Sequence, residues 1–132
     1  MNIGAAARAS GVTAKMIRHY QAIGLLPAGT RGDNGYRRLS EREVHLLRFI
    51  RRARGLGFSL EQTRALLSLW QDPGRSSGDV KRLAQVHIEE LDRRIAEITE
   101  MRDTLQQLAR TCHGDQRPDC PILQNLGSGN NL

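Results

Sequence analysis

The sequence is poor in several features, and each shortage excludes a class of protein. Only five of its 132 side chains are aromatic, which suits small helical packing units better than a large enzyme core. The sequence contains neither a phosphate-binding glycine loop nor a Ser-His-Asp grouping, so no motif in it indicates catalysis. No apolar run approaches the roughly 20 residues that cross a bilayer, and the first residues lack the pattern of a secretion signal. We therefore expect a cytoplasmic protein with no membrane partner and no enzymatic activity.

Cysteine is also scarce, and the two that exist, Cys112 and Cys120, lie close together in the stretch C-H-G-D-Q-R-P-D-C. The glycine, proline and aspartates between them disfavour a helix and predict a turn-rich loop that can fold both thiols toward one point. Pro121 follows at once and begins a short apolar stretch, which is typical of the first turn of a helix. The N-terminus of that helix would favour a thiolate at Cys120.

Spacing alone leaves three interpretations of the cysteine pair: a metal site, a redox disulfide, or two thiols without a role. Two thiolates without further ligands suit a soft ion that accepts two-coordination, such as Cu(I), Ag(I) or Au(I), whereas structural zinc requires four ligands. Structural disulfides are rare in the reducing cytoplasm, which favours metal. The adjacent His113 is a possible third ligand, but a two-thiolate site is already complete, so we favour a role in capping the loop.

Positive charge gathers in the first half of the chain. Residues 1–58 hold eleven Lys and Arg against three acidic residues, whereas residues 59–132 hold nine against eleven. The first half is therefore the part expected to bind a polyanion.

The first residues predict a helix-turn-helix. A short helix that begins near Ile3 is broken at Ser10 and Gly11, and a second helix is capped by Thr13 and stopped by Gly24. Two ordinary amphipathic helices are the alternative, but a glycine turn between short helices is typical of the DNA-binding motif, whose second helix lies in the major groove. The exposed face of that helix would carry Lys15, Arg18 and His19, and its packing side Met16, Ile17 and Tyr20.

The next segment predicts a β-hairpin, which would form the wing of a winged helix-turn-helix. Asn34 and Gly35 tolerate the positive φ of a tight turn, and short β-capable stretches flank them. The arginines around the hairpin's tip, Arg31, Arg37 and Arg38, would reach backbone phosphates, and Tyr36 would pack on sugar or phosphate. Contacts of this kind position a protein on DNA without reading its sequence.

Two serines predict the starts of the next two helices. Ser40 with Glu43, and Ser59 with Gln62, have the spacing of a capping box, and an apolar helical pattern follows each pair. Gly55 and the glycine two residues later would end the first of these helices. We place the end of the DNA-binding domain after this helix pair, at residue 71.

One long helix is expected from Asp79 to Thr111. Its apolar residues repeat with a period of seven, as in a coiled coil. A helix of this length that packs only on its own domain is the alternative, but the seam has nothing of its own chain to bury it, so we expect an antiparallel homodimer. The residues of the seam are Ala84, Ile88, Leu91, Ile95, Ile98, Leu105 and Ala109, with Arg102 as an interruption.

The expected fold is therefore mainly α: a winged helix-turn-helix followed by a long coiled-coil helix and a C-terminal metal-binding loop. We divide the chain into a DNA-binding domain (1–71), a linker (72–78), a dimerisation helix (79–111), a metal-binding loop with a short helix (112–126) and a disordered tail (127–132).

Together these segments resemble the MerR family of transcriptional regulators, and within it the copper-efflux (CueR-like) branch, over nearly the whole chain. The stretches that carry the resemblance are T-A-K-M-I-R-H-Y-Q-A-I-G-L-L, N-G-Y-R-R-L-S, R-R-A-R-G-L-G-F-S-L-E, D-P-G-R-S-S-G-D-V-K and C-H-G-D-Q-R-P-D-C-P-I.

The resemblance implies a homodimer that binds a palindromic element in double-stranded promoter DNA. On binding metal it would distort an over-spaced promoter, so that RNA polymerase transcribes efflux or detoxification genes. A thiol redox sensor and a sensor of divalent heavy metals are the alternatives within the same family.

The resemblance also assigns residues. Cys112 and Cys120 would bind one Cu(I) per subunit, with Ag(I) or Au(I) as alternatives. Ser77 stands where the family's divalent-ion sensors have a cysteine that joins the metal site from the partner subunit, and its serine favours a monovalent ion. His19 stands where the family often has an aromatic residue, so the match does not support it as a base reader. The DNA contacts that carry over are Lys15, Arg18, Tyr20, Arg31, Tyr36, Arg37 and Arg54.

Overall fold

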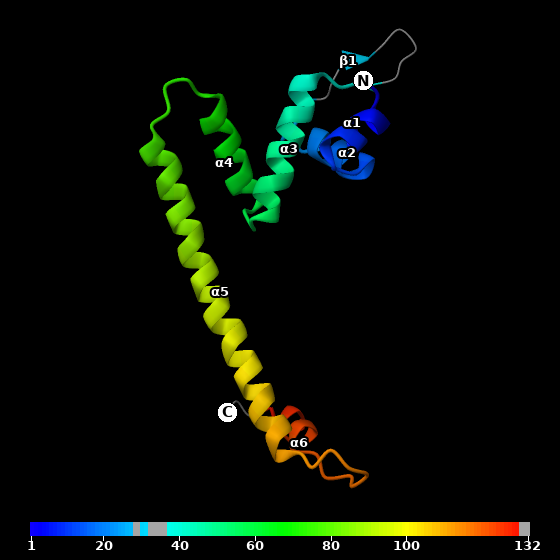
Figure 1. The fold of residues 1–132 in the computed structure, drawn as a ribbon, viewed down its shortest axis with the longest axis vertical. Coiled ribbons are helices and arrows are strands. Elements are labelled where there is room, and N and C mark those ends of the chain that lie inside the picture. Colours follow the sequence, from blue (N-terminus) through cyan, green and yellow to red (C-terminus); the bar gives the residue numbers. More distant parts are fainter. Residues whose placement is uncertain (28–29, 32–36, 130–132) are drawn as a thin grey trace. The chain divides into compact units, whose positions relative to one another are not determined.

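The computed structural model describes residues 1–27, 30–31 and 37–129, and it is mainly helical, as the sequence predicted (Figure 1). The chain divides into two compact units, Met1–Leu83 and Ala84–Leu132. The long helix α5 begins in the first unit and continues through the second. Within the described residues, no helix has the length and apolarity needed to cross a membrane.

The chain begins with the predicted helix-turn-helix. Helix α1 spans Ile3–Ser10 and helix α2 spans Ala14–Ala22. The Thr13 side chain caps α2 by accepting a hydrogen bond of 3.2 Å from the Met16 backbone N–H, as predicted. Gly11 has a φ of 77°, a left-handed conformation in which glycine avoids the Cβ clash of other residues.

The core of the first unit joins α1, α2, α3 and α4. Ile17 is fully buried and Tyr20 nearly so, as predicted for the packing side of α2. The prediction for Met16 was wrong: its side chain is 37% exposed, because it lies about 100° around the helix from Ile17, at the edge of the packed face. The buried apolar residues of this core are Ala6, Val12, Ile17, Tyr20, Leu25, Leu26, Leu39, Val44, Leu46, Leu47, Ile50 and Leu67.

Two short antiparallel strands follow the helix-turn-helix. Strand β1 (Thr30–Arg31) pairs with β2 (Arg37–Arg38), in a register that sets Thr30 opposite Arg38 and Arg31 opposite Arg37. This antiparallel pairing is the one expected of the two strands of a wing. The predicted turn at Asn34 and Gly35, and the predicted contact residue Tyr36, lie outside the described residues.

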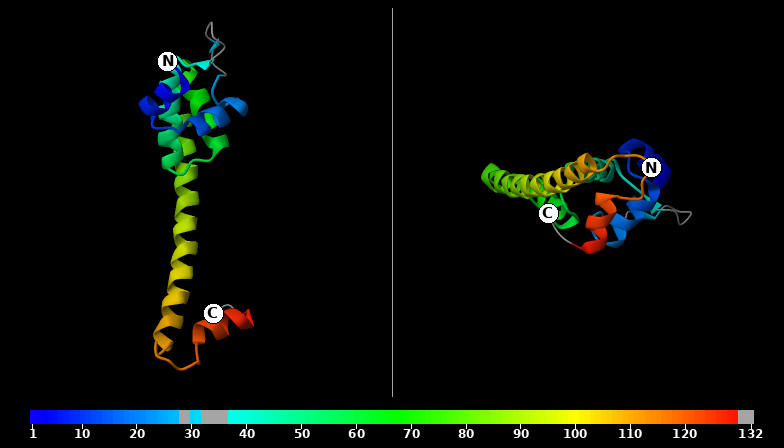
Figure 2. Two further views of the ribbon diagram at one scale, coloured as in Figure 1. Left: turned by 90° about the vertical axis from the view of Figure 1, so that its right-hand side faces the viewer. Right: turned by 90° about the horizontal axis from the view of Figure 1, so that it is seen from below.

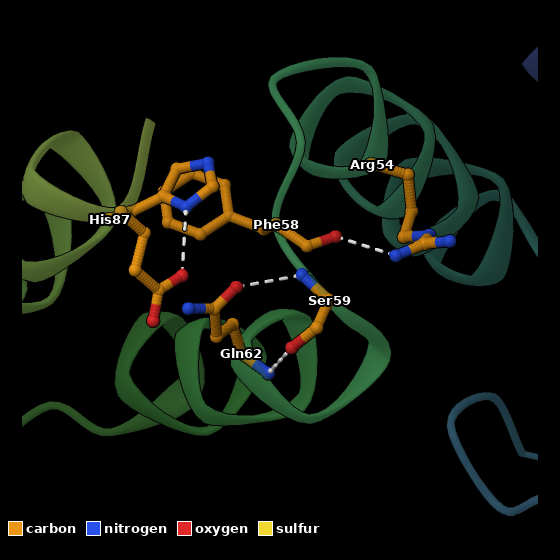
Figure 3. A network of polar contacts seen from close by, with 6 residues as sticks. Arg54, Phe58, Ser59, Gln62 and His87 are labelled. Carbon is orange, nitrogen blue, oxygen red and sulfur yellow. Dashed lines mark hydrogen bonds and ion pairs between the residues drawn. The ribbon is translucent and has the colours of Figure 1, made fainter. Parts of the chain in front are cut away.

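Both predicted capping boxes are present. Helix α3 (Glu41–Gly55) begins with Ser40 and Glu43, and helix α4 (Leu60–Gln71) begins with Ser59 and Gln62. Figure 3 shows the second box, in which the Gln62 backbone N–H donates to the Ser59 hydroxyl over 3.1 Å and the Ser59 N–H donates to the Gln62 side chain over 2.7 Å. Each box satisfies two backbone donors that a helix start otherwise leaves without partners.

Helix α5 spans Ser77–Thr111, so it begins two residues earlier than predicted. The reason is local, because the Ser76 hydroxyl accepts a hydrogen bond from the Asp79 N–H over 3.2 Å and so caps the helix before that residue. The predicted linker therefore includes two helical residues.

Helix α6 spans Pro121–Ser128, with proline at its first turn as predicted. It extends into the segment that we expected to be a disordered tail. Gly129 ends it with a φ of 71°, and a glycine in this left-handed conformation is a common helix stop. The expectation for residues 127–129 was therefore wrong, and residues 130–132 lie outside the described residues.

Candidate functional site

The two cysteines flank the loop that joins α5 to α6, and Figure 2 shows the chain turning at this loop before it enters α6, drawn in red. Cys112 follows the last residue of α5, and its backbone N–H donates to the Ala109 carbonyl over 3.2 Å. Cys120 occupies the N-cap position of α6. Both side chains are half-buried, and they form no disulfide. Each sulfur is thus carried at the end of a helix, and the connection between the helices is short.

The loop is shaped by its own residues. Gly114 has a φ of 66°, which lets the chain turn after α5. The Asp115 carboxylate then accepts a hydrogen bond of 2.9 Å from the Arg117 backbone N–H and forms an ion pair of 2.8 Å with the Arg117 side chain. Turns of this kind are the reason that aspartate is frequent in loops. Asp115 is therefore occupied within the loop.

The donor set at this loop is small. Within the described residues, no group of three or more His, Cys, Asp or Glu side chains lies close enough together to hold a metal ion. His113 is exposed beside Cys112. A donor set of two soft sulfurs fits an ion that accepts two ligands, and it does not provide the four ligands of structural zinc.

Ser77 is the first residue of α5, in the first structural unit, and its side chain is exposed. The helix cap at this position is supplied by Ser76 instead, so the Ser77 hydroxyl is not needed to begin the helix.

The predicted DNA-reading residues divide into two groups on α2. Lys15, Arg18 and His19 are exposed, so they are available to a ligand. Tyr20 is only 6% exposed and belongs to the core. Its ring lies 6.0 Å from the His19 ring, centroid to centroid. Packing is therefore the role of Tyr20 in the structure, and only a small part of its surface is available for DNA.

The remaining predicted contacts come from the wing and from the end of α3. Arg31 and Arg37 are paired across the two strands. Arg54 lies in the last turn of α3, and its guanidinium donates to the Phe58 carbonyl over 2.6 Å (Figure 3). That bond ties Arg54 to the loop between α3 and α4.

The structure also shows a group of three arginines on α3 that the predicted DNA contacts did not include. Arg48, Arg51 and Arg52 lie on one face of α3 and, with Ser10 and Gly55, line a shallow hollow of about 300 Å³. Their i, i+3 and i+4 spacing was the signal that could have identified them.

Comparison with known proteins places these features in a family. Residues 1–70 match the family model described as "MerR HTH family regulatory protein", and residues 44–108 match "MerR, DNA binding". The chain is 54% identical over 129 residues to "Heavy metal-dependent transcription regulator 2" of Rhizobium meliloti, covering 98% of this chain and 88% of that protein. It is 42% identical over 126 residues to "HTH-type transcriptional regulator CueR" of Salmonella typhimurium, covering 96% and 91%.

A solved structure agrees with this result. The transcription regulator PbrR691 from Ralstonia metallidurans, crystallised with lead(II), superposes with a TM-score of 0.81 at 30% identity, covering 96% of this chain and 98% of that one. The fold is thus a MerR fold, with an N-terminal helix-turn-helix, the long α5 and a C-terminal region. The chain belongs to the MerR family, whose members are DNA-binding transcription regulators and not enzymes.

Proposed function

We propose that this regulator senses a monovalent soft metal ion, Cu(I) or its relatives Ag(I) and Au(I), through Cys112 and Cys120. The observation that carries the proposal is the pair of half-buried cysteines at the two helix ends around one short loop, with Asp115 already engaged by Arg117. Two thiolates are a complete ligand set for a two-coordinate soft ion. The bound metal would supply a bridge between the end of α5 and the start of α6.

The relatives' names support dependence on a heavy metal, and the preference for copper rests on the resemblance to the CueR-like branch. The 54% identical relative is named as heavy metal-dependent, and the CueR regulators are 42% identical. Ser77 supports a monovalent ion through the family resemblance, because divalent-ion sensors of the family have at this position a cysteine that reaches the metal site from the partner subunit. We propose the copper-efflux branch of the family on these grounds.

We propose that the chain acts as a homodimer on double-stranded promoter DNA, in the presence of RNA polymerase. The apolar seam of α5 supports this proposal, because four of its large side chains are more than half exposed in the single chain. An apolar stripe of this kind requires a second surface. These side chains are Ile88 (53%), Ile95 (62%), Ile98 (62%) and Leu105 (53%).

In the proposed mechanism, metal favours one conformation of the dimer, and that conformation distorts the promoter so that RNA polymerase uses it. A ligand shifts a conformational equilibrium only if it binds one state more tightly. The loop offers such a difference, since an ion held by both Cys112 and Cys120 restricts the position of α6 against the end of α5. The exposed Lys15 and Arg18, together with Arg31, Arg37 and Arg54, would hold the promoter in both states.

The first test is Cys112→Ser. We expect this variant to keep its affinity for the promoter and to lose the transcriptional response to Cu(I), because it removes one of two metal ligands after α5, whereas the DNA-binding residues precede α5 in the chain. Binding would be measured by fluorescence anisotropy in reducing buffer, and activation by transcription in vitro from an over-spaced promoter. His113→Ala is the matched control, and it should keep both properties.

The same assay separates the alternatives. Activation by Cu(I) in excess reductant would exclude a disulfide switch, which the free thiols otherwise permit. Activation by Pb(II), Hg(II) or Zn(II) but not by monovalent ions would replace the proposed ion with a divalent one. Loss of promoter binding together with metal response in Cys112→Ser would contradict the separation of sensing from DNA binding.

A further inference from the structure

Three arginines of α3 form a basic cluster that lies outside the predicted DNA contacts. Arg48, Arg51 and Arg52 share one face of the helix, and all three side chains are exposed. With Ser10 and Gly55 they surround the shallow hollow described above. We call these three residues the α3 arginine cluster.

The α3 arginine cluster places three positive charges on one exposed face of the helix. Across the residues that the structure describes, no carboxylate lies within ion-pair distance of any of the three guanidinium groups. Like charges at i, i+3 and i+4 on a helix repel one another. An anion bound in the hollow would offset this repulsion, so the cluster is suited to a negatively charged ligand.

Two contacts hold the cluster against the turn of the helix-turn-helix. The Arg48 side chain donates from Nε and Nη2 to the Ala9 carbonyl, over 3.1 and 3.0 Å. Arg51 lies against Gly11, since a Cβ atom on that glycine would be 2.8 Å from Arg51 Nη1. Gly11 precedes the Thr13 cap of α2 by two residues. The cluster therefore lies beside the N-terminal end of α2.

The position of the cluster identifies the anion. A recognition helix directs its N-terminal residues at the base edges, so the phosphates that border the groove lie near the same end. Guanidinium groups bind phosphate oxygens with two parallel hydrogen bonds. We propose that Arg51 and Arg52 bind the phosphate backbone of double-stranded DNA, and that Arg48 positions the cluster on the turn. The proposal rests on DNA binding by this chain and is independent of metal sensing.

The test is the salt dependence of DNA binding by the full chain. Wild type, Arg51→Ala and Arg52→Ala would be titrated over a range of salt against two duplexes, one of random sequence and one selected by the protein from a random pool. Each alanine substitution should make the negative slope of log K against log salt shallower by about 0.9. With the affinity at about 1 M salt unchanged, this corresponds to roughly eightfold weaker binding at 0.1 M salt. Both duplexes should be affected equally, because backbone contacts carry no sequence information.

Two further variants separate phosphate binding from other roles. Arg93→Ala removes the same charge from an exposed position on α5 and should leave the slope unchanged. The double variant Arg51→Lys with Arg52→Lys should retain most of the slope, since lysine also binds phosphate as a point charge. Thermal unfolding of each variant confirms its fold. Within the described chain the Arg52 guanidinium has no hydrogen-bond partner, so Arg52→Ala keeps the test valid if Arg51→Ala is unstable.

Three results would overturn the proposal. The first is a folded Arg52→Ala protein that binds DNA with the wild-type affinity and the wild-type dependence of log K on log salt, which would place the cluster away from DNA. Arg93→Ala could lose as much as the cluster variants, which would reduce the effect to net charge. The loss could fall on the selected duplex alone, which would indicate base reading. None of these results depends on a response to metal, so the proposed sensing function would be unaffected.

Discussion

At the residue scale, the two left-handed glycines near α2 show how a single position determines the path of the chain. Gly11 has a φ of 77° and Gly24 a φ of 75°, so both adopt a backbone conformation that L side chains rarely occupy. Their surroundings differ. A Cβ at Gly24 would meet nothing within 4 Å, whereas one at Gly11 would meet the Arg51 guanidinium. A substitution at Gly24 therefore reports the cost of the left-handed backbone alone, whereas one at Gly11 adds the cost of the contact with Arg51.

We expect Gly24→Ala to lower the free energy of unfolding by about 1–2 kcal/mol, which is the usual cost of the left-handed region for an alanine. Gly11→Ala should cost at least as much and should also displace Arg51. Urea unfolding, followed by circular dichroism, would measure the loss of unfolding free energy in both variants. A shallower dependence of DNA affinity on salt in Gly11→Ala would report the displacement of Arg51. A Gly11→Ala protein with wild-type stability would contradict the left-handed turn.

The spacing of apolar residues predicted which residues of α2 are buried, but it could not predict the exposure of every residue at the edge of the buried face. Ile17 and Tyr20 are three residues apart and are both buried, as predicted. Met16 lies beside them in sequence and is exposed, because periodicity defines an average direction and not the edge of the packed face. Tyr20 was assigned both to packing and, by resemblance, to DNA, and the structure buries it.

At the scale of elements, helix starts were the features that the sequence predicted best. Thr13, Ser40 and Ser59 each cap the helix that was expected to follow. The reason is physical: a cap is a contact between residues about three apart, so its participants are adjacent in the sequence. The start of α5 was missed because two serines precede Asp79, and the structure uses the hydroxyl of Ser76.

A test at this scale is Ser59→Ala. The substitution removes the hydroxyl that accepts from the Gln62 N–H and should lower the free energy of unfolding by about 1 kcal/mol. Ser68→Ala is the matched control, since Ser68 is exposed within α4 and alanine is the better helix former there. Denaturant unfolding of both variants would check the difference. Equal stability of the two would mean that the capping box of α4 contributes nothing.

At the scale of the whole molecule, the sequence predicted the apolar seam of α5, but it could not show which surface covers that seam. The period of seven on α5 was visible in the sequence, and Ile88, Ile95 and Ile98 of that seam are each more than half exposed in the chain. Periodicity reports which residues share a face, but it does not report what covers that face. The grouping of Arg48, Arg51 and Arg52 was equally visible, and only the contacts to Ala9 and Gly11 connect it to the helix-turn-helix.

The proposed dimer is tested by Ile95→Asp. A carboxylate in the α5 seam would have to be buried without a partner, so we expect the dimer to dissociate at micromolar concentration, with weaker promoter binding as a consequence. Ala96→Asp adds the same charge at the next residue, an exposed position outside the seam, and should remain dimeric. Sedimentation equilibrium would measure both. A dimeric Ile95→Asp protein, or an equal effect of both variants, would place the subunit contact on another surface.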